Sequence, residues 1–206
     1  MINSLVFAHV FLGGIALLAG AIALASKKGG RFHRLSGKIF FYSLLVSALT
    51  AMSLSTMPGH ENPFLFTIGI FCVYFILSGY LALRHKNPTV HLLPDQLISL
   101  TMLLTGVIMI AFPVIYYGGF NIVMTVFGAL GIFLSIQDFR LYRNKERLQK
   151  NYLSSHLVKM IAAYISAFTA FVVVNQFLPG IYGWLAPGFV GTFFILFWTR
   201  RVAKIQ

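Results

Sequence analysis

Seven long apolar runs divide this chain of 206 residues, and each is close to the length needed to cross a bilayer. A helix of roughly 20 apolar residues spans the hydrocarbon layer, and a helix satisfies all of its own backbone polar groups there. Short breaks rich in Gly, Pro, Asn and charge separate the runs. The predicted spans are Ile2–Ala25, Ile39–Met57, Phe64–Leu83, Pro94–Tyr116, Asn121–Phe139, Leu153–Phe177 and Tyr182–Thr199.

The composition excludes an ordinary soluble domain. Hydrophobic residues make up 58% of the chain and charged residues only 10%. The first run is predicted to be a retained span and not a secretory signal, because Lys27 and Lys28 follow it and no basic residue precedes it. The connections are too short for a soluble domain. We therefore expect an all-α, polytopic membrane bundle formed by one domain, residues 1–206.

The net charge of +12 is distributed unevenly, which predicts an orientation. The loops 58–63, 117–120 and 178–181 carry no Lys or Arg. Apart from Lys159, in the first turns of the sixth span, every cation follows an odd-numbered span: Lys27, Lys28, Arg31, Arg34, Lys38, Arg84, Lys86, Arg140, Arg143, Lys145, Arg147, Lys150, Arg200, Arg201 and Lys204.

The positive-inside rule then places the N-terminus outside and the C-terminus in the cytoplasm. The expected partners are the lipid bilayer, its anionic headgroups at the cytoplasmic face and other membrane subunits, but not nucleic acid. The expected location is a bacterial inner membrane, crossed several times. The basic break 140–151 is predicted to be a helical extension at the cytoplasmic headgroups.

Stripes of small residues mark one face of each of the first two spans. The stripes, at helical spacing, are His9, Gly13, Ala16 and Gly20, and Ser43, Ser47, Ala51 and Ser55. Small residues let membrane helices approach closely, so the stripes predict helix packing. The alternative is that they leave room for a flat cofactor. In either case His9 faces protein and not lipid.

Three histidines fall at one predicted depth. His33, His91 and His156 lie at the cytoplasmic ends of the second, fourth and sixth spans, and Asp95 lies in the first turn of the fourth, where the helix dipole favours a carboxylate. His85 is expected in a flexible charged loop, with no helix to orient it.

Asp138 closes the fifth span, at a helix end where the dipole disfavours a carboxylate. We therefore predict that it pairs with Lys159 or with an Arg of the following loop.

The opening of the chain resembles a known family. His9 is followed by Gly13-Gly14 and Ala19-Gly20, and then by His33-Arg34 and Gly37-Lys38. This pattern is similar to an uncharacterised family of bacterial predicted membrane proteins, a domain of unknown function of the DUF2306 type. It is also similar, faintly, to the membrane domains of b-type cytochromes. The second resemblance implies a haem, and neither implies an established reaction.

Three functions remain open at this point. In the first, histidines among His9, His33, His91 and His156 bind a b-type haem, and cations such as Arg34 pair with its propionates. In the second, His33, His91, His156 and Asp95 bind a divalent metal such as zinc and activate a water for hydrolysis. In the third, the bundle is a non-catalytic membrane subunit or scaffold. The sequence does not decide whether the protein is an enzyme.

Overall fold

The computed structural model describes residues 2–203, and Lys204 lies outside this range. The described residues form helices joined by short loops. In chain order these are α1 (Ile2–Ala25), α2 (Arg31–Leu54), α3 (Pro63–Ala82), the 3₁₀ helix η1 (Leu83–Lys86), α4 (Leu93–Tyr117), α5 (Ile122–Tyr142), α6 (Lys145–Lys150), α7 (Tyr152–Val174) and α8 (Ile181–Ala203).

Seven of the helices in residues 2–203 are long and apolar enough to cross a membrane, which confirms the predicted all-α, seven-span architecture. The largest difference from the predicted bounds is at α2, which begins at Arg31 and not at Ile39. Its first two turns carry the basic residues that precede the apolar run. His33 and Arg34 are therefore held on a helix and not in a loop.

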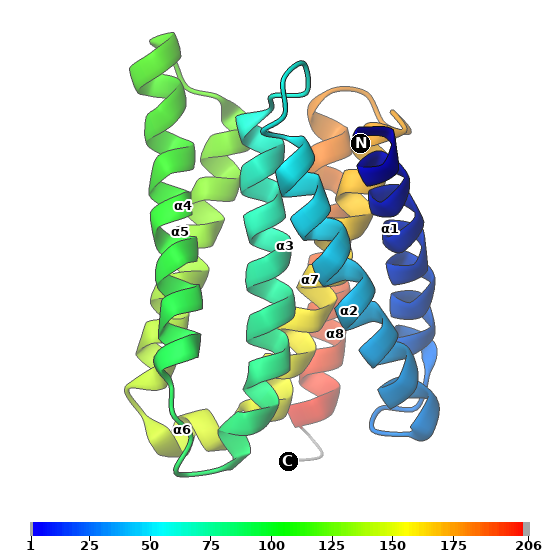
Figure 1. Ribbon diagram of the computed structural model, residues 1–206. Helices are drawn as coiled ribbons and strands as arrows, with labels where there is room; N and C mark the ends of the chain where they lie inside the picture. Colours follow the sequence, from blue (N-terminus) through cyan, green and yellow to red (C-terminus); the bar gives the residue numbers. More distant parts are fainter. Residues whose placement is uncertain (1, 204–206) are drawn as a thin grey trace.

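The long helices run up and down, so the loops collect at two ends of the bundle (Figure 1). One end carries the loops 26–30, 83–92 and 143–151 and the last turn of α8, and we call it the basic end. It is the lower end in Figure 1, and the N-terminus lies at the opposite end. The predicted segregation of cations is thus a feature of the folded chain, whereas the side of the membrane that each end faces stays a prediction.

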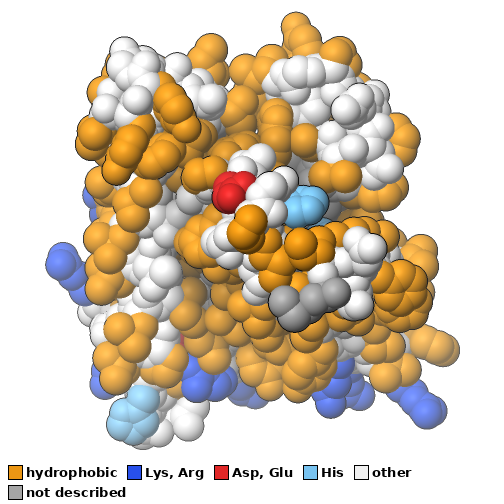
Figure 2. All heavy atoms as spheres, turned by 45° about the horizontal axis from the view of Figure 1, so that its top comes forward, with side chains coloured by type: hydrophobic (Ala, Val, Ile, Leu, Met, Phe, Trp, Pro, Cys, Tyr) orange, Lys and Arg blue, Asp and Glu red, His pale blue; other side chains and the backbone are white. Residues whose placement is uncertain are grey.

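Helix α3 occupies the centre of the bundle. It packs against α2, α4 and α7, and the α1–α2 and α4–α5 hairpins flank it (Figure 1). Among its buried side chains are Phe71, Tyr74 and Ile76, which belong to the main core cluster with Met102 of α4 and Ala163 of α7. The outward faces of the helices are hydrophobic, and Lys and Arg gather toward the lower part of Figure 2. This distribution fits a bundle surrounded by lipid.

The stripes of small residues face neighbouring helices, as the sequence predicts. Ala16 and Gly20 are buried, and a Cβ at Gly20 would clash with the Tyr164 ring. Ser47 donates a hydrogen bond to the His9 carbonyl at 3.0 Å, and His9 Nδ1 donates to the Ser47 carbonyl at 2.9 Å. The prediction that His9 faces protein is confirmed, because the reciprocal bonds tie α1 to α2.

The basic segment after α5 contains the short helix α6, in line with the predicted helical extension. Asn144 caps it, because its side-chain oxygen accepts a hydrogen bond from the backbone N–H of Arg147 at 2.9 Å. Leu148 is buried although the other residues of α6 are charged or polar. This leucine fixes α6 against the bundle, so the charged side chains of α6 point outward.

Candidate functional site at the basic end

A buried ion pair joins α5 to α7 inside the bundle. Lys159 Nζ donates to Asp138 Oδ2 at 2.7 Å, and both residues are buried. The predicted pairing of Asp138 with Lys159 is therefore confirmed. Ionisable residues within spanning helices are costly unless paired, and they tend to be functional. The pair is the first candidate for a functional group in this protein.

Two hydroxyl groups from other helices complete the shell of the same carboxylate oxygen. The Tyr74 hydroxyl of α3 donates to Asp138 Oδ2 at 2.6 Å, and Ser99 Oγ of α4 donates to it at 3.1 Å. The Lys159 ammonium also contacts the Tyr74 hydroxyl and lies 4.1 Å from the centroid of the Tyr74 ring. One carboxylate oxygen thus collects donors from three helices, α3, α4 and α7.

The cluster continues toward the basic end through Tyr142. Its hydroxyl lies 3.2 Å from Ser99 Oγ, and because the Ser99 hydrogen is directed at Asp138, Tyr142 is the donor to Ser99. Asp138 and Tyr142 are four residues apart on α5, so they share one face. We call Tyr74, Ser99, Asp138, Tyr142 and Lys159 the polar cluster.

Two further hydroxyls lie one helical turn from members of the polar cluster. Ser78 follows Tyr74 by four residues on α3, and Ser135 precedes Asp138 by three on α5. Both are buried, and their oxygens have no hydrogen-bond partner among the described residues. Buried polar atoms are usually bonded, so these two extend the polar lining beyond the groups that already pair.

A second buried carboxylate lies one turn from the polar cluster. Asp95 of α4 is 1% exposed and accepts a hydrogen bond from His85 Nε2 at 2.8 Å and another from Arg84 at 3.2 Å. The expectation of a flexible, unoriented His85 is wrong: the residue lies in η1 and is 3% exposed. The reason is that η1 turns the end of α3 back toward the start of α4, so the buried carboxylate holds the imidazole.

The two histidines predicted at the cytoplasmic starts of spans two and six share one bonding pattern. His33 Nδ1 donates to the Ala23 carbonyl of α1 at 3.0 Å, and His156 Nδ1 donates to the Gly79 carbonyl of α3 at 2.7 Å. No hydrogen bond to the Nε2 of either histidine is found within residues 2–203. In the neutral imidazole, a proton held at Nδ1 leaves the Nε2 lone pair free to bind a metal.

His33 of α2 and His156 of α7 lie in the first two turns of helices that both start at the basic end. Their helices meet two turns further from the basic end, where the rings of Phe40 and Tyr164 have centroids 6.2 Å apart. Phe40 follows His33 by seven residues, which places it on nearly the same face of α2, and Tyr164 follows His156 by eight, which places it about 80° around α7 from the histidine. The two predicted site residues thus lie at the same end of two helices whose side chains contact each other.

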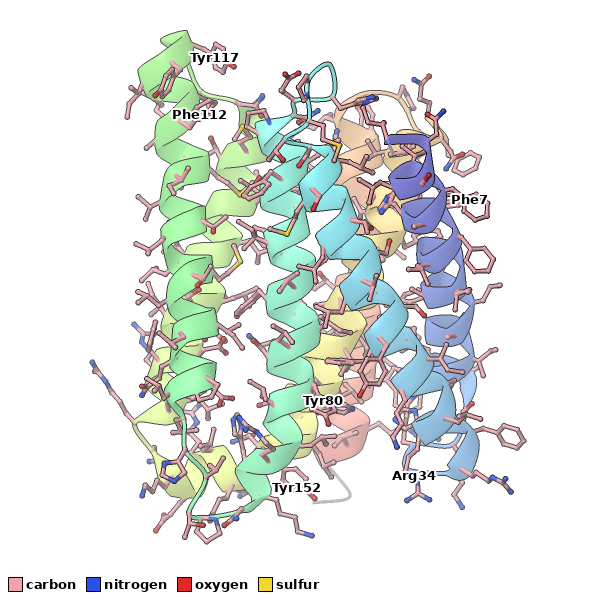
Figure 3. All side chains as sticks on the ribbon, viewed as in Figure 1. Phe7, Arg34, Tyr80, Phe112, Tyr117 and Tyr152 are labelled. Atoms are coloured by element: carbon pink, nitrogen blue, oxygen red, sulfur yellow. The ribbon has the colours of Figure 1, made fainter. Side chains whose placement is uncertain are left out.

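The other predicted site residues are not part of this pair. His9 is bonded to Ser47 in the half of α2 nearer the opposite end, and His91 is exposed in the loop before α4. Asp95 is engaged by His85 and Arg84, and Arg34 is exposed at the basic end (Figure 3). Among the described residues there is no group of three or more His, Cys, Asp or Glu side chains placed to hold a metal ion.

Lys28 shares the Ala23 carbonyl with His33. Lys28 Nζ donates to the Ala23 and Leu24 carbonyls at 3.2 and 2.6 Å, which satisfies the C-terminal end of α1. It also lies 4.3 Å from the centroid of the Trp198 ring of α8. Partial burial lowers the pKa of Lys28. Arg34 and Tyr152 mark the same end of the bundle in Figure 3.

Sequence reasoning missed Tyr74 and Ser99 as partners of the ion pair. Both lie within apolar runs, where a lone Tyr or Ser is ordinary. The available signal was the ion pair itself, since a carboxylate and an ammonium inside a bundle require further hydrogen-bond partners from facing helices. Which Tyr and which Ser supply them depends on how the helices are rotated, and only the folded structure shows that.

The comparisons with known proteins give one match. Residues 6–94 match the model of a family described as predicted membrane protein (DUF2306), which confirms the resemblance seen in the opening of the chain. The matched segment contains His9, His33 and Tyr74 and ends before Asp138, His156 and Lys159. Searches of the curated proteins and of the solved structures found no match.

Proposed function

We propose that this multi-pass membrane protein is a redox protein that binds one b-type haem at its basic end, between His33 of α2 and His156 of α7. The observation that carries the proposal is the shared bonding pattern of the two imidazoles. Each gives its Nδ1–H to a backbone carbonyl of a neighbouring helix, which orients the ring and leaves Nε2 available. Two such histidines at one depth on facing helices are what a bis-histidine haem requires.

The surroundings of the two histidines suit a haem. Haem iron accepts imidazole ligands, and the surrounding burial and hydrogen bonds tune its potential. The apolar rings of Phe40 and Tyr164 lie on the inner side of the pair, while cations lie on the outer side. Arg34 and Lys28 are the candidates to pair with the propionates. When bound, the haem would supply one-electron transfer.

The divalent-metal hypothesis has less support. It needs His33, His91 and His156 together with Asp95, but Asp95 is held by Arg84 and His85, and His91 is exposed on a loop. A hydrolytic zinc site needs three protein ligands within about 2.0–2.2 Å of one ion. The hypothesis of a non-catalytic subunit remains the alternative if neither haem nor metal binds.

The proposal includes a location. By the positive-inside rule, the basic end faces the cytoplasm and the N-terminus faces outward, in a bacterial inner membrane. The haem would then lie near the cytoplasmic surface, among anionic headgroups that attract the same cations. This placement favours a soluble cytoplasmic electron donor or acceptor, or another membrane subunit, as the redox partner.

Variants of the histidines test the proposal. His33→Ala and His156→Ala should each remove most of the haem from the purified protein, and the double variant should lose little more, because one ligand loss already breaks the unit. His156→Met should keep haem with a raised midpoint potential, since Met/His ligation raises the potential. The control His91→Ala should keep a full haem content. Loss of haem in His91→Ala, with haem kept in His33→Ala, would contradict the proposed ligand pair.

A further inference from the structure

We propose that the polar cluster is a proton-binding site linked to the haem, and that Asp138 takes up one proton from the basic end when the haem gains one electron. This inference rests on the proposed haem function. The site differs from the proposed haem site in its ligand, which is a proton, and in its residues, which do not contact His33 or His156. Four observations support it.

The first observation is the charge of the cluster. Asp138 and Lys159 form a neutral pair, and the other groups that face Asp138 are hydroxyls from α3, α4 and α5. In the described part of the chain, the charged side chains of α6 are exposed and those of α8 lie in its last turn. Adding a proton to a neutral buried pair leaves an uncompensated cation, which is costly. The site therefore binds a proton only when a negative charge arrives nearby.

The second observation is the short spacing between Lys159 and the proposed haem ligand His156, where a negative charge would arrive. Lys159 follows His156 by three residues on α7, so the two side chains lie on one face about one turn apart. An electron added to a haem bound at His156 is thus one turn from the Asp138–Lys159 pair. In a weakly screened interior, charges at this separation interact strongly. One electron and one proton together leave the net charge of the region unchanged.

The third observation is a route to the basic end. Asp95 precedes Ser99 by four residues on α4, and it lies within electrostatic range of Tyr142. The His85 ring stands edge-on to the Tyr142 ring, with centroids 6.1 Å apart, and its buried Nδ1 has no partner among the described residues. Arg84, which is partly exposed, connects Asp95 to the surface. His85, Asp95 and Tyr142 are therefore titratable groups between the partly exposed Arg84 and the polar cluster.

The proton balance along this route is simple. Ser99 Oγ gives its hydrogen to Asp138 Oδ2, Tyr142 gives its hydrogen to Ser99, and a hydronium ion of the solvent at the basic end restores the proton of Tyr142. The carboxylate of Asp138 becomes a carboxylic acid, and this proton would balance the electron that an external one-electron donor gives to a bound haem. No hydrogen bond to Asp138 Oδ1 is found within residues 2–203, so a second acceptor stays available to Lys159.

The fourth observation is a seal on the other side. Met102 and Phe71 are 0% and 1% exposed, and both pack onto Gly131 of α5, where an added Cβ would lie 2.5 Å from Met102 Cε. Each of these residues lies further from the basic end than the polar-cluster residue on the same helix. Gly131 is two turns from Asp138 on α5, Phe71 is one turn from Tyr74 on α3, and Met102 is one turn from Ser99 on α4. This apolar layer contains no group that can pass a proton. These three residues close the path between α3, α4 and α5 on the side away from the basic end.

The test is a mediated redox titration of the purified holoprotein between acidic and basic pH. We expect the haem midpoint potential to fall as the pH rises. The limiting slope for one proton per electron is a tenfold change in the reduction equilibrium constant per pH unit, which is about 59 mV for a one-electron couple. The double variant Asp138→Asn with Lys159→Met carries no unpaired charge, so it should fold and should lose this slope. The control Glu61→Gln, in an exposed loop at the opposite end, should keep it.

A second readout reports the proton directly. The reduced-minus-oxidised infrared spectrum of the wild type should contain a carboxylic-acid C=O band that is absent from the double variant. Ser99→Ala should keep the dependence of the midpoint potential on pH. It should slow the proton-coupled phase of reduction by about tenfold or more.

The outcomes separate the two proposals. A bound haem with a pH-independent potential, or a slope that survives in the double variant, overturns this inference alone. A Ser99→Ala variant that reduces as fast as the wild type overturns the route. Protein that binds no haem overturns the proposed function, and this inference with it.

Discussion

The ammonium of Lys159 in α7 lies 2.7 Å from the carboxylate of Asp138 in α5, in the interior of the bundle. Lys159 is the one charged group that bonds to Asp138 among the described residues. The other two donors to the same carboxylate oxygen are the neutral hydroxyls of Tyr74 and Ser99. The two charges therefore depend on each other.

This dependence predicts a strongly non-additive pair of substitutions. Asp138→Asn and Lys159→Met should each destabilise the protein by about 3–5 kcal/mol, because each leaves one buried charge without its partner. The double variant should recover most of that loss. The free energy of unfolding in detergent measures all three. Single-variant losses that simply add would show that the two charges do not interact.

A second prediction concerns His85, which the structure places against Asp95. His85→Ala should lower the free energy of unfolding by about 1.5–3 kcal/mol, because it removes a hydrogen bond to a buried charged group. Lys86→Ala, at the exposed neighbouring position, should change it by no more than about 0.5 kcal/mol. Equal effects of the two substitutions in the same unfolding measurement would mean that the imidazole does not support Asp95.

A third prediction concerns the contact between α4 and α5. A Cβ at Gly128 would lie 2.7 Å from the Gly106 carbonyl oxygen, a backbone atom that cannot move without moving its helix. Gly128→Ala should therefore cost about 1–3 kcal/mol in unfolding free energy. Gly14→Ala is the matched control, because a Cβ there meets nothing within 4 Å. We expect it to be neutral or stabilising, and a neutral Gly128→Ala would contradict the close approach.

A fourth prediction tests the orientation. In a background where the buried Cys72 is replaced by Ala, a cysteine at Gly119 should react with an impermeant thiol reagent in intact cells, and one at Lys145 should not. Gly119 lies in the loop between α4 and α5 at the end opposite the basic end, and Lys145 is exposed on α6. The reverse pattern would place the basic end, and the proposed haem, outside the cell.

Much of the fold follows from the sequence, because runs of about 20 apolar residues have few alternatives to spanning helices. The pairing of Asp138 with Lys159 also follows, since an unpaired carboxylate there would be costly. The position of His85 does not follow. Its neighbours Arg84 and Lys86 are typical of a solvated loop, and only the turn of η1 toward the start of α4 brings it to Asp95.

The candidate site follows only in part. The common depth of His33 and His156 can be predicted from the alternation of spans, but His91 shares that depth and is not part of the pair. What separates them is whether a helix carries the histidine. His33 and His156 face carbonyls of α1 and α3, whereas His91 precedes α4 on an exposed loop. The sequence alone does not encode that difference in a local pattern.

The most direct test of the proposed haem is the visible absorption spectrum of the wild-type protein, purified from cells with an ample haem supply and measured before and after reduction together with its metal content. We predict a haem spectrum that changes on reduction, with about one iron and no zinc per chain. Zinc without haem would favour the hydrolase hypothesis, and a preparation with neither would contradict the proposed function.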